Sequence, residues 1–226
     1  HRVVAGPRKK SRLLSPKEKR IIAFHEAAHA LVAKSLPNTD PVHEVTIVSR
    51  GSALGYVLQL PTEDRYLVTK AQILDRVTAT LAGRAAEEMI FEDVSSGAAN
   101  DLEAATHLVR RMIMEFGMSE KLGPLTFGRK EGQVFLGRDL GRERDFSEEV
   151  AAEIDEEERR IIRECYAKTK EILSEKKETL TALAEALLEH ETLKGEELEA
   201  VFAGKPLPKD QGQAQPTSDK PGAVPE

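Results

Sequence analysis

The stretch His25-Glu26-Ala27-Ala28-His29 follows the pattern H-E-x-x-H. In a helix, residues four positions apart lie on one face a turn apart, so His25 and His29 can share one metal ion. Zinc sites of this pattern use both imidazoles as ligands, and the glutamate between them acts as the general base. The stretch therefore predicts a helix with two zinc ligands and the base Glu26. A catalytic zinc site needs a third protein ligand, which has to come from elsewhere in the chain.

The residues on either side indicate where this helix begins and ends. Ser15-Pro16-Lys17-Glu18 combines an N-cap serine, a proline at the first helical position and a capping-box glutamate. Pro37-Asn38 is a strong stop signal. We therefore expect the helix over residues 15–36.

Two short stretches after this helix have the composition of β-strands. Residues 44–49 and 54–60 are rich in Val, Ile, Tyr and Leu, and Arg50-Gly51-Ser52 between them favours a turn. Together they predict a hairpin. Residues 117–141 contain six glycines and show little periodicity, so we expect a long surface loop there.

Apolar side chains recur at helical spacing in most of the remaining chain. This spacing predicts one helix over residues 69–91, another over 99–116, and two or three more within 146–202. The sequence therefore predicts a mainly α fold with a small β-hairpin or sheet, in which the H-E-x-x-H helix carries part of a metal site.

Composition limits the class of protein. A chain of 226 residues with 40% hydrophobic residues can bury the core of one sizeable domain. The net charge of −6 argues against nucleic acid as the main partner. Cys165 is the only cysteine, which excludes an intrachain disulfide and favours a reducing compartment. No stretch approaches the roughly 18 apolar residues that a membrane span requires.

Composition also divides the chain into three regions. Residues 1–14 are basic and contain Gly6-Pro7, so we expect a linker, and because the chain starts at His1 we expect it to be a piece of a longer protein. Residues 15–203 contain the expected helices and strands and are expected to form the domain with the metal site, which the resemblance described below implies to be a zinc peptidase domain. Residues 204–226 hold five prolines and almost no apolar side chains, which predicts a disordered tail.

Local patterns do not supply the third ligand. A metzincin would have glycine at Val32 and histidine at Ser35, so that class is excluded. A thermolysin-like site needs a glutamate on a helix some twenty residues later, but Asp40-Pro41-Val42-His43-Glu44 resembles the entry to a strand. The remaining candidates are Glu87 and Glu88, within an expected helix, and Asp101, at the start of the next helix. Asp101 at a helix N-terminus is also explained as a capping acid, so the residues alone leave the assignment open between Asp101 and Glu87.

Several segments occur in the order, and at nearly the spacing, of one known family. The chain resembles the peptidase domain of the FtsH family, the membrane-anchored ATP-dependent zinc proteases of bacteria and organelles. The resemblance covers about residues 6–202 and implies a mostly helical fold with a small β-element. It rests on His25-Glu26-Ala27-Ala28-His29, Asp40-Pro41-Val42-His43, Arg50-Gly51-Ser52-Ala53-Leu54-Gly55, Gly83-Arg84-Ala85-Ala86-Glu87-Glu88 and Ser96-Gly97-Ala98-Ala99-Asn100-Asp101-Leu102.

The resemblance assigns roles to individual residues. His25 and His29 match the zinc histidines of the family, and Glu26 matches its catalytic base. Asp101 matches the aspartate that completes the zinc triad. Glu87 matches a glutamate that we expect near the site, where it supports the ligands.

The resemblance also assigns a substrate-binding strand, and it shows one departure. The strand that begins with Gly55, Tyr56, Val57 and Leu58 matches the edge along which family members bind extended polypeptide. The family usually has glycine where this chain has Ala28. An alanine is compatible with the helix and the ligands, but its methyl group is expected to crowd whatever packs against that face.

As a whole, the resemblance implies an endopeptidase that degrades unfolded, misfolded or membrane-extracted proteins fed by an attached AAA ATPase ring. It implies one Zn²⁺ per chain. ATP is used by the ATPase module and not by this chain, which lacks a G-x-x-x-x-G-K-[ST] phosphate loop. Gly6 matches the linker between the ATPase and peptidase modules.

The expected partners are polypeptide substrates, the ATPase module of the parent chain and further copies in a homohexamer, with the acidic helices after Asp145 as contacts. No nucleic acid partner is expected. We expect the parent protein in the bacterial inner membrane, held by spans outside this sequence, with this domain on the cytoplasmic side and the fragment itself soluble. The alternative is a non-catalytic helical assembly module with a structural metal site.

Overall fold

The computed structural model describes residues 14–49, 54–62, 66–128 and 146–208. Almost all of the expected linker and C-terminal tail, including Gly6, lies outside the described residues. The same holds for the expected turn at Arg50-Gly51-Ser52 and for the second half of the expected surface loop.

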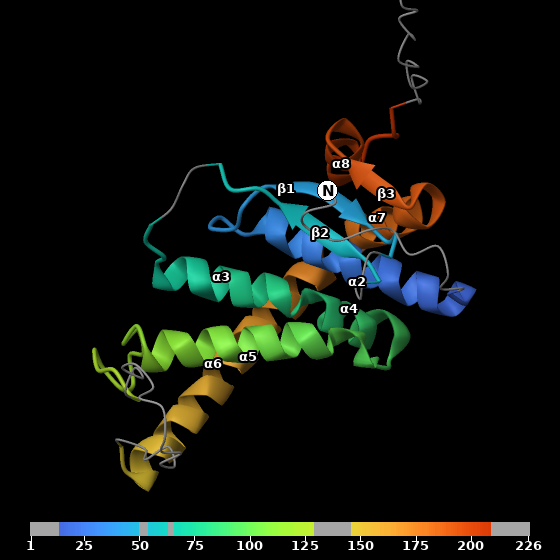
Figure 1. Ribbon diagram of the computed structural model, residues 1–226. Coiled ribbons are helices and arrows are strands. Elements are labelled where there is room, and N and C mark those ends of the chain that lie inside the picture. Colours follow the sequence, from blue (N-terminus) through green and yellow to red (C-terminus); the bar gives the residue numbers. More distant parts are fainter. Residues whose placement is uncertain (1–13, 50–53, 63–65, 129–145, 209–226) are drawn as a thin grey trace, which may run out of the picture.

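Helix α2 (Pro16–Ser35) carries the H-E-x-x-H stretch and lies at the centre of the fold (Figure 1). Its first turn is closed by a capping box: the Glu18 N–H donates to Ser15 Oγ at 3.2 Å, and the Ser15 N–H donates to Glu18 Oε2 at 2.8 Å. The expected bounds of this helix are confirmed to within one residue. Helix α2 contacts helices on several sides and the sheet, so its polar site residues are held by a rigid element.

The sheet has three antiparallel strands in the order β2-β1-β3. Strands β1 (Val42–Thr46) and β2 (Tyr56–Gln59) pair as the expected hairpin. Strand β3 (Thr192–Lys194) pairs with the other side of β1 and was not expected. Strand β2 therefore lies at one edge of the sheet, and both β1 and β2 contact α2.

The expectation of one continuous helix over residues 69–91 is wrong. Helix α3 (Lys70–Thr80) ends at Leu81, and helix α4 (Ala82–Phe91) begins there. The break coincides with two side-chain hydrogen bonds from other parts of the fold. Thr169 Oγ1 donates to the Thr78 carbonyl, and His29 Nδ1 lies 2.8 Å from the Ala79 carbonyl oxygen. These tertiary contacts leave the apolar periodicity unbroken, so the sequence pattern does not reveal the break.

The other expected helices are present. A short 3-10 turn, η1 (Ser96–Ala98), leads directly into α5 (Ala99–Met114). The C-terminal part contains α6 (Glu148–Glu175), α7 (Lys177–His190) and α8 (Glu196–Phe202). In Figure 1 the long helix α6 crosses α3, α4 and α5, and all three contact it.

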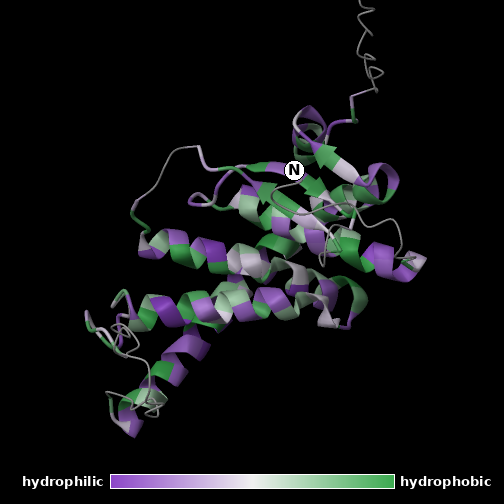
Figure 2. Ribbon diagram, in the orientation of Figure 1, coloured by the Kyte–Doolittle hydropathy of each residue, from purple (hydrophilic) through white to green (hydrophobic). Residues whose placement is uncertain are grey.

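Two hydrophobic clusters hold these elements together. One joins α2 to the sheet and to α4, α7 and α8, and the other lies among α3, α5 and α6. Hydrophobic and hydrophilic residues alternate around the helices, as expected for amphipathic helices with one buried face (Figure 2). The prediction of a mainly α fold with a small sheet is confirmed. In the described part of the chain, no helix combines the length and apolarity needed to cross a bilayer.

Candidate metal centre

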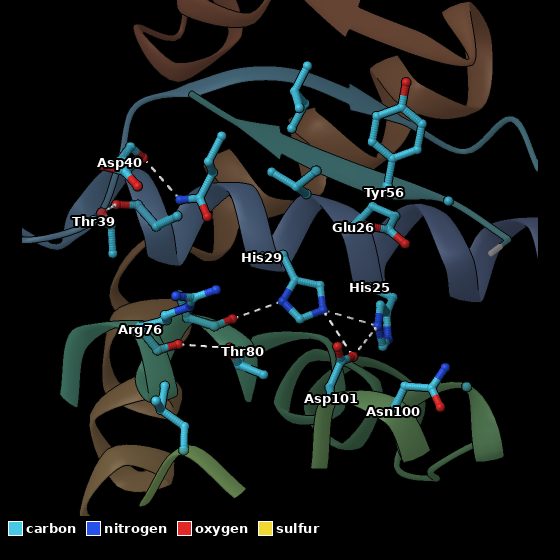
Figure 3. A pocket seen from close by; sticks show the side chains of 18 of the residues that line it. His25, Glu26, His29, Thr39, Asp40, Tyr56, Arg76, Thr80, Asn100 and Asp101 are labelled. Carbon is cyan, nitrogen blue, oxygen red and sulfur yellow. Dashed lines mark hydrogen bonds and ion pairs between the residues drawn. The ribbon is translucent and has the colours of Figure 1, made fainter. Parts of the chain in front are cut away.

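Three ligand atoms from two helices converge on one point. His25 Nε2 lies 3.1 Å from His29 Nε2 and 3.1 Å from Asp101 Oδ2, and His29 Nε2 lies 3.3 Å from Asp101 Oδ2. The three side chains point toward one another in Figure 3. Ligands about 2.05 Å from a tetrahedral zinc ion are separated by about 3.3 Å. The spacing of these atoms therefore fits three corners of a zinc tetrahedron.

Hydrogen bonds at the far side of each ring determine which nitrogen can bind a metal. The Ala79 carbonyl oxygen only accepts, so the His29 Nδ1 atom at 2.8 Å carries the proton and donates it. His25 Nδ1 lies 2.9 Å from Glu87 Oε1 and donates to that carboxylate. Both Nε2 lone pairs then face the Asp101 carboxylate across the same small space. Two imidazole nitrogens and one carboxylate oxygen form a donor set that suits zinc.

Glu87 is fixed from two sides and is only 2% exposed. Its second oxygen accepts from the Ser95 N–H at 2.6 Å. Burial alone would raise the pKa of Glu87, but the hydrogen bonds with His25 and Ser95 lower it below its usual range. Glu87 therefore presents a charged carboxylate to His25 Nδ1 and orients the ring.

His25 and Asp101 also stabilise opposite charges on each other. Burial disfavours the charged form of His25, but the hydrogen bonds with Asp101 and Glu87 outweigh this effect and raise its pKa to about 10. Burial would likewise raise the pKa of Asp101, but hydrogen bonds with both histidines hold it well below its usual range. The site thus favours a carboxylate and a positive charge together.

The fold explains why Asp101 reaches this point. It lies in the first turn of α5, directly after η1, whose N-cap Ser95 accepts a hydrogen bond from the Gly97 N–H at 3.0 Å. A carboxylate in a first helical turn is stabilised by the helix dipole and by free backbone N–H groups. The capping explanation of Asp101 and the ligand explanation are therefore compatible.

Glu26 lies next to the converging ligands on α2 and is 8% exposed. Its carboxylate faces the start of β2 near Gly55, on the cleft side of the helix (Figure 3). Burial raises the pKa of Glu26 above its usual range, although the nearby histidines oppose this shift. A carboxylate with a raised pKa accepts a proton from water more readily near neutral pH.

These residues lie in a cleft of about 1500 Å³. One wall is formed by Gly55 and by Tyr56, Val57 and Leu58 of β2, and other walls come from α3 and from Asn100 and Asp101 at the start of α5. Since β2 is the edge strand of the sheet that the described residues form, the cleft places one edge of this sheet beside the converging side chains. Every residue that the sequence singled out for the site lines this cleft.

Comparison with known families agrees with this geometry. Residues 12–201 match the model of peptidase family M41. The chain belongs to this family. Its resemblance to the FtsH peptidase domain is thereby confirmed, and the family match covers the whole cleft and both helices that carry the ligands.

Several similar proteins are named ATP-dependent zinc metalloprotease FtsH. The ATP-dependent zinc metalloprotease FtsH of Pseudothermotoga lettingae is 58% identical over 202 residues, which are 89% of this chain and 32% of the relative. The FtsH proteins of Thermotoga maritima and Bacillus subtilis are 54% and 51% identical, over 89% and 92% of this chain and 33% of each relative. The chain thus spans about a third of the length of these relatives.

Two partners of the site were not found from the sequence. The Ala79 carbonyl holds His29, and the Ser95 N–H holds Glu87, but both are backbone groups that any residue type could supply. Only Ser95 gives a sequence signal, as an N-cap serine before a helix.

Ala28, the departure from the family pattern, is completely buried in the core, and α2 continues through it without interruption.

Proposed function

We propose that this chain is the peptidase module of an ATP-dependent zinc metalloprotease, and that His25, His29 and Asp101 bind the zinc ion. The observation that carries the proposal is the convergence of three ligand atoms, 3.1 to 3.3 Å apart, with Glu26 beside them on the same helix. Membership of peptidase family M41 and relatives named zinc metalloproteases support it.

Zinc at this position supplies a Lewis acid that acidifies water and polarises a peptide carbonyl. Glu26 accepts a proton from the attacking water and then donates it to the departing amine. Its burial raises the pKa of this carboxyl, which suits it to both steps. Glu87 accepts a hydrogen bond from Nδ1–H of His25, and the Ala79 carbonyl accepts one from Nδ1–H of His29. These hydrogen bonds hold the two imidazole rings in place.

We propose that the substrate is an extended polypeptide bound along β2. An edge strand offers main-chain donors and acceptors that pair with any unfolded sequence. Gly55, Tyr56, Val57 and Leu58 would provide this edge, and the peptide would then pass between β2 and the start of α5, over the ligands.

The parent protein is part of the proposal, because the chain spans about a third of its relatives. We propose that an AAA ATPase module of the same parent chain unfolds proteins and feeds them to this cleft, and that the parent acts as a homohexamer. We propose further that the parent is anchored in the bacterial inner membrane, with this module on the cytoplasmic side.

Substitution of the base tests the catalytic assignment. Glu26→Gln should bind zinc as the wild type does but should not cleave unfolded casein. Glu88→Gln is the matched control, since Glu88 lies on α4 and pairs with Tyr166 and Lys170 away from the cleft. Cleavage by Glu26→Gln at the wild-type rate would show that the base is another residue. If the wild-type parent protein binds zinc yet cleaves nothing, the non-catalytic assembly module is the better description.

A second experiment tests the strand edge. A series of fluorogenic peptides, each N-methylated at one position, removes one main-chain donor at a time without changing any side chain. Pairing with β2 predicts that methylation at alternate positions raises KM. An equal response at every position would contradict pairing with the strand.

A further inference from the structure

The ring of His25 lies directly against the backbone of Gly83 in α4. A Cβ atom built on Gly83 would lie 2.3 Å from Cε1 of His25, 2.4 Å from Nε2 and 2.5 Å from Nδ1. These distances are far inside any carbon contact. A single methyl group at Gly83 is therefore incompatible with the position that His25 takes between Glu87 and Asp101.

Glu26 has a similar relationship with Gly55, at the start of β2. A Cβ atom on Gly55 would lie 2.8 Å from Cγ and 2.8 Å from Oε1 of Glu26. It would also lie 2.8 Å from the Thr46 carbonyl oxygen on β1. The missing side chain thus lets the strand edge and the carboxylate approach each other closely.

Backbone conformation does not explain either glycine. The described glycines with positive φ are Gly117, Gly123, Gly128, Gly195 and Gly204, so Gly55 and Gly83 adopt conformations that other residues also adopt. Gly83 lies inside a helix, where glycine is less stable than alanine. The reason for glycine is therefore the space taken by His25 beside Gly83, and by Glu26 and the Thr46 carbonyl oxygen beside Gly55.

We propose that Gly83 and Gly55 are positioning residues, whose lack of a side chain sets the depth at which His25 and Glu26 stand in the cleft. Gly83 lies in α4 and contacts His25, whereas Gly55 directly precedes β2 and contacts Glu26. Gly83 positions His25, and its role rests on the proposed zinc site. Gly55 positions Glu26, and its role rests on the proposed catalytic function.

The two substitutions should therefore have separable effects. In Gly83→Ala the ring of His25 has to move, so it cannot keep Glu87 at Nδ1 and stay near Asp101 at Nε2. Loss of ligand support of this kind typically costs 10- to 100-fold in metal affinity, which is the decrease expected here. In Gly55→Ala the zinc ligands are untouched, so zinc affinity should stay within about twofold while the position of Glu26 changes.

Zinc affinity of the 226-residue chain, measured by competition with a chromogenic chelator, tests the first half. Gly195→Ala is the control for general strain, because Gly195 has φ 52° and no atom of the described residues lies within 4 Å of its Cβ position. Gly83→Ala should bind zinc at least tenfold more weakly, and Gly195→Ala should bind it like the wild type. Wild-type affinity in Gly83→Ala would overturn the assignment.

The melting temperature (Tm) of the metal-free chain distinguishes a clash between a methyl group at position 83 and the His25 ring from general misfolding of the Gly83→Ala variant. When His25→Ala removes the ring, a methyl group at position 83 has space and gains the helix preference of alanine. Gly83→Ala should therefore raise Tm in the His25→Ala background and lower it in the wild-type background. The same change of Tm in both backgrounds would show that the two residues are not coupled.

Cleavage of a short fluorogenic peptide tests Gly55. Gly55→Ala should lower kcat at least tenfold while zinc affinity is kept, because a purely structural loss would reduce both. An unchanged kcat would overturn the role of Gly55. If the wild-type protein itself does not cleave, the proposed function fails, whereas the zinc affinity and Tm results still decide the role of Gly83.

Discussion

His25 Nδ1 lies 2.9 Å from Glu87 Oε1, although the two residues are 62 positions apart in the sequence. The same carboxylate accepts the Ser95 N–H through its other oxygen. Helix α4, the turn before α5 and helix α2 are thus joined at one buried acid. Because the carboxylate accepts a hydrogen bond from Nδ1–H, the Nε2 atom of His25 is directed toward His29 and Asp101.

Removal of this carboxylate should weaken metal binding without removing a ligand. We expect Glu87→Ala to lower zinc affinity by about 10- to 100-fold, because His25 loses the group that orients its ring. Chelator competition measures the change. The neighbouring Glu88→Ala provides the control, since Glu88 is 44% exposed and faces Lys170. Equal affinities of the two variants would contradict a supporting role for Glu87.

Loss of the third ligand should have a larger effect. Asp101→Ala removes an oxygen within 3.3 Å of both histidine nitrogens, so zinc affinity should fall further than in Glu87→Ala. The control is Glu103→Ala, two residues further along the same helix on its exposed side. If Asp101→Ala binds zinc normally, the third ligand is another group, and Glu87 is the next candidate.

Local sequence signals predict the helix that carries His25, Glu26 and His29. They do not predict the features that depend on contacts between residues far apart in the sequence. The cap at Ser15 and the stop at Pro37 fix the ends of α2 within the chain itself. The break at Leu81 and strand β3 depend on partners far away: His29 and Thr169 bind carbonyls at the break, and β3 has only three residues that pair with β1. The spacing of apolar residues along the chain does not reveal such distant partners.

The third ligand shows the same limit. The H-E-x-x-H stretch determines its own geometry because a helix fixes the spacing of residues i and i+4. The distance from α2 to α5 is set by packing, so the residues alone left Asp101 and Glu87 open, and the family resemblance favoured Asp101. In the structure both carboxylates contact His25, Asp101 at Nε2 and Glu87 at Nδ1. They differ in the nitrogen of His25 that each one faces, and Asp101 also lies 3.3 Å from His29 Nε2.

The packing of α2 against α7 predicts a stability effect. Leu183 on α7 is fully buried in the cluster around α2. Leu183→Ala should lower the free energy of unfolding by about 2–5 kcal/mol, because it leaves a cavity in a packed core. Urea unfolding measures the loss. Leu67→Ala, at a side chain that is 85% exposed, should change stability by less than about 0.5 kcal/mol. Equal effects would contradict this packing.

A buried acid remote from the metal centre predicts a pH dependence. Glu157 is completely buried on α6, where it accepts hydrogen bonds from Arg160 at 2.7 Å and from Ser119 at 2.8 Å. The hydrogen bond from Arg160 is the main reason why the pKa of Glu157 is lowered. The charged form is thus favoured in the folded state. Its contribution is complete above the ordinary carboxyl pKa of about 4.3 and is lost as the pH falls toward the lowered value.

Glu157→Gln should therefore be less stable than the wild type at pH 7, by about 1–3 kcal/mol. The difference should shrink below about pH 4, as the wild-type carboxylate becomes protonated. Urea unfolding at several pH values measures this convergence. Glu153→Gln, at an exposed position on the same helix, should follow the wild type throughout. A difference that stays constant down to pH 3 would show that charge on Glu157 does not stabilise the fold.

We propose that zinc binds where two imidazoles and one carboxylate converge. A crystal structure of the zinc-loaded protein, with anomalous data collected at the zinc absorption edge, tests it most directly. We expect one anomalous peak about 2.0–2.2 Å from His25 Nε2, His29 Nε2 and Asp101 Oδ2, with Glu87 still bound to Nδ1 of His25. A peak at another position, or one coordinated by Glu87 in place of Asp101, would contradict the account.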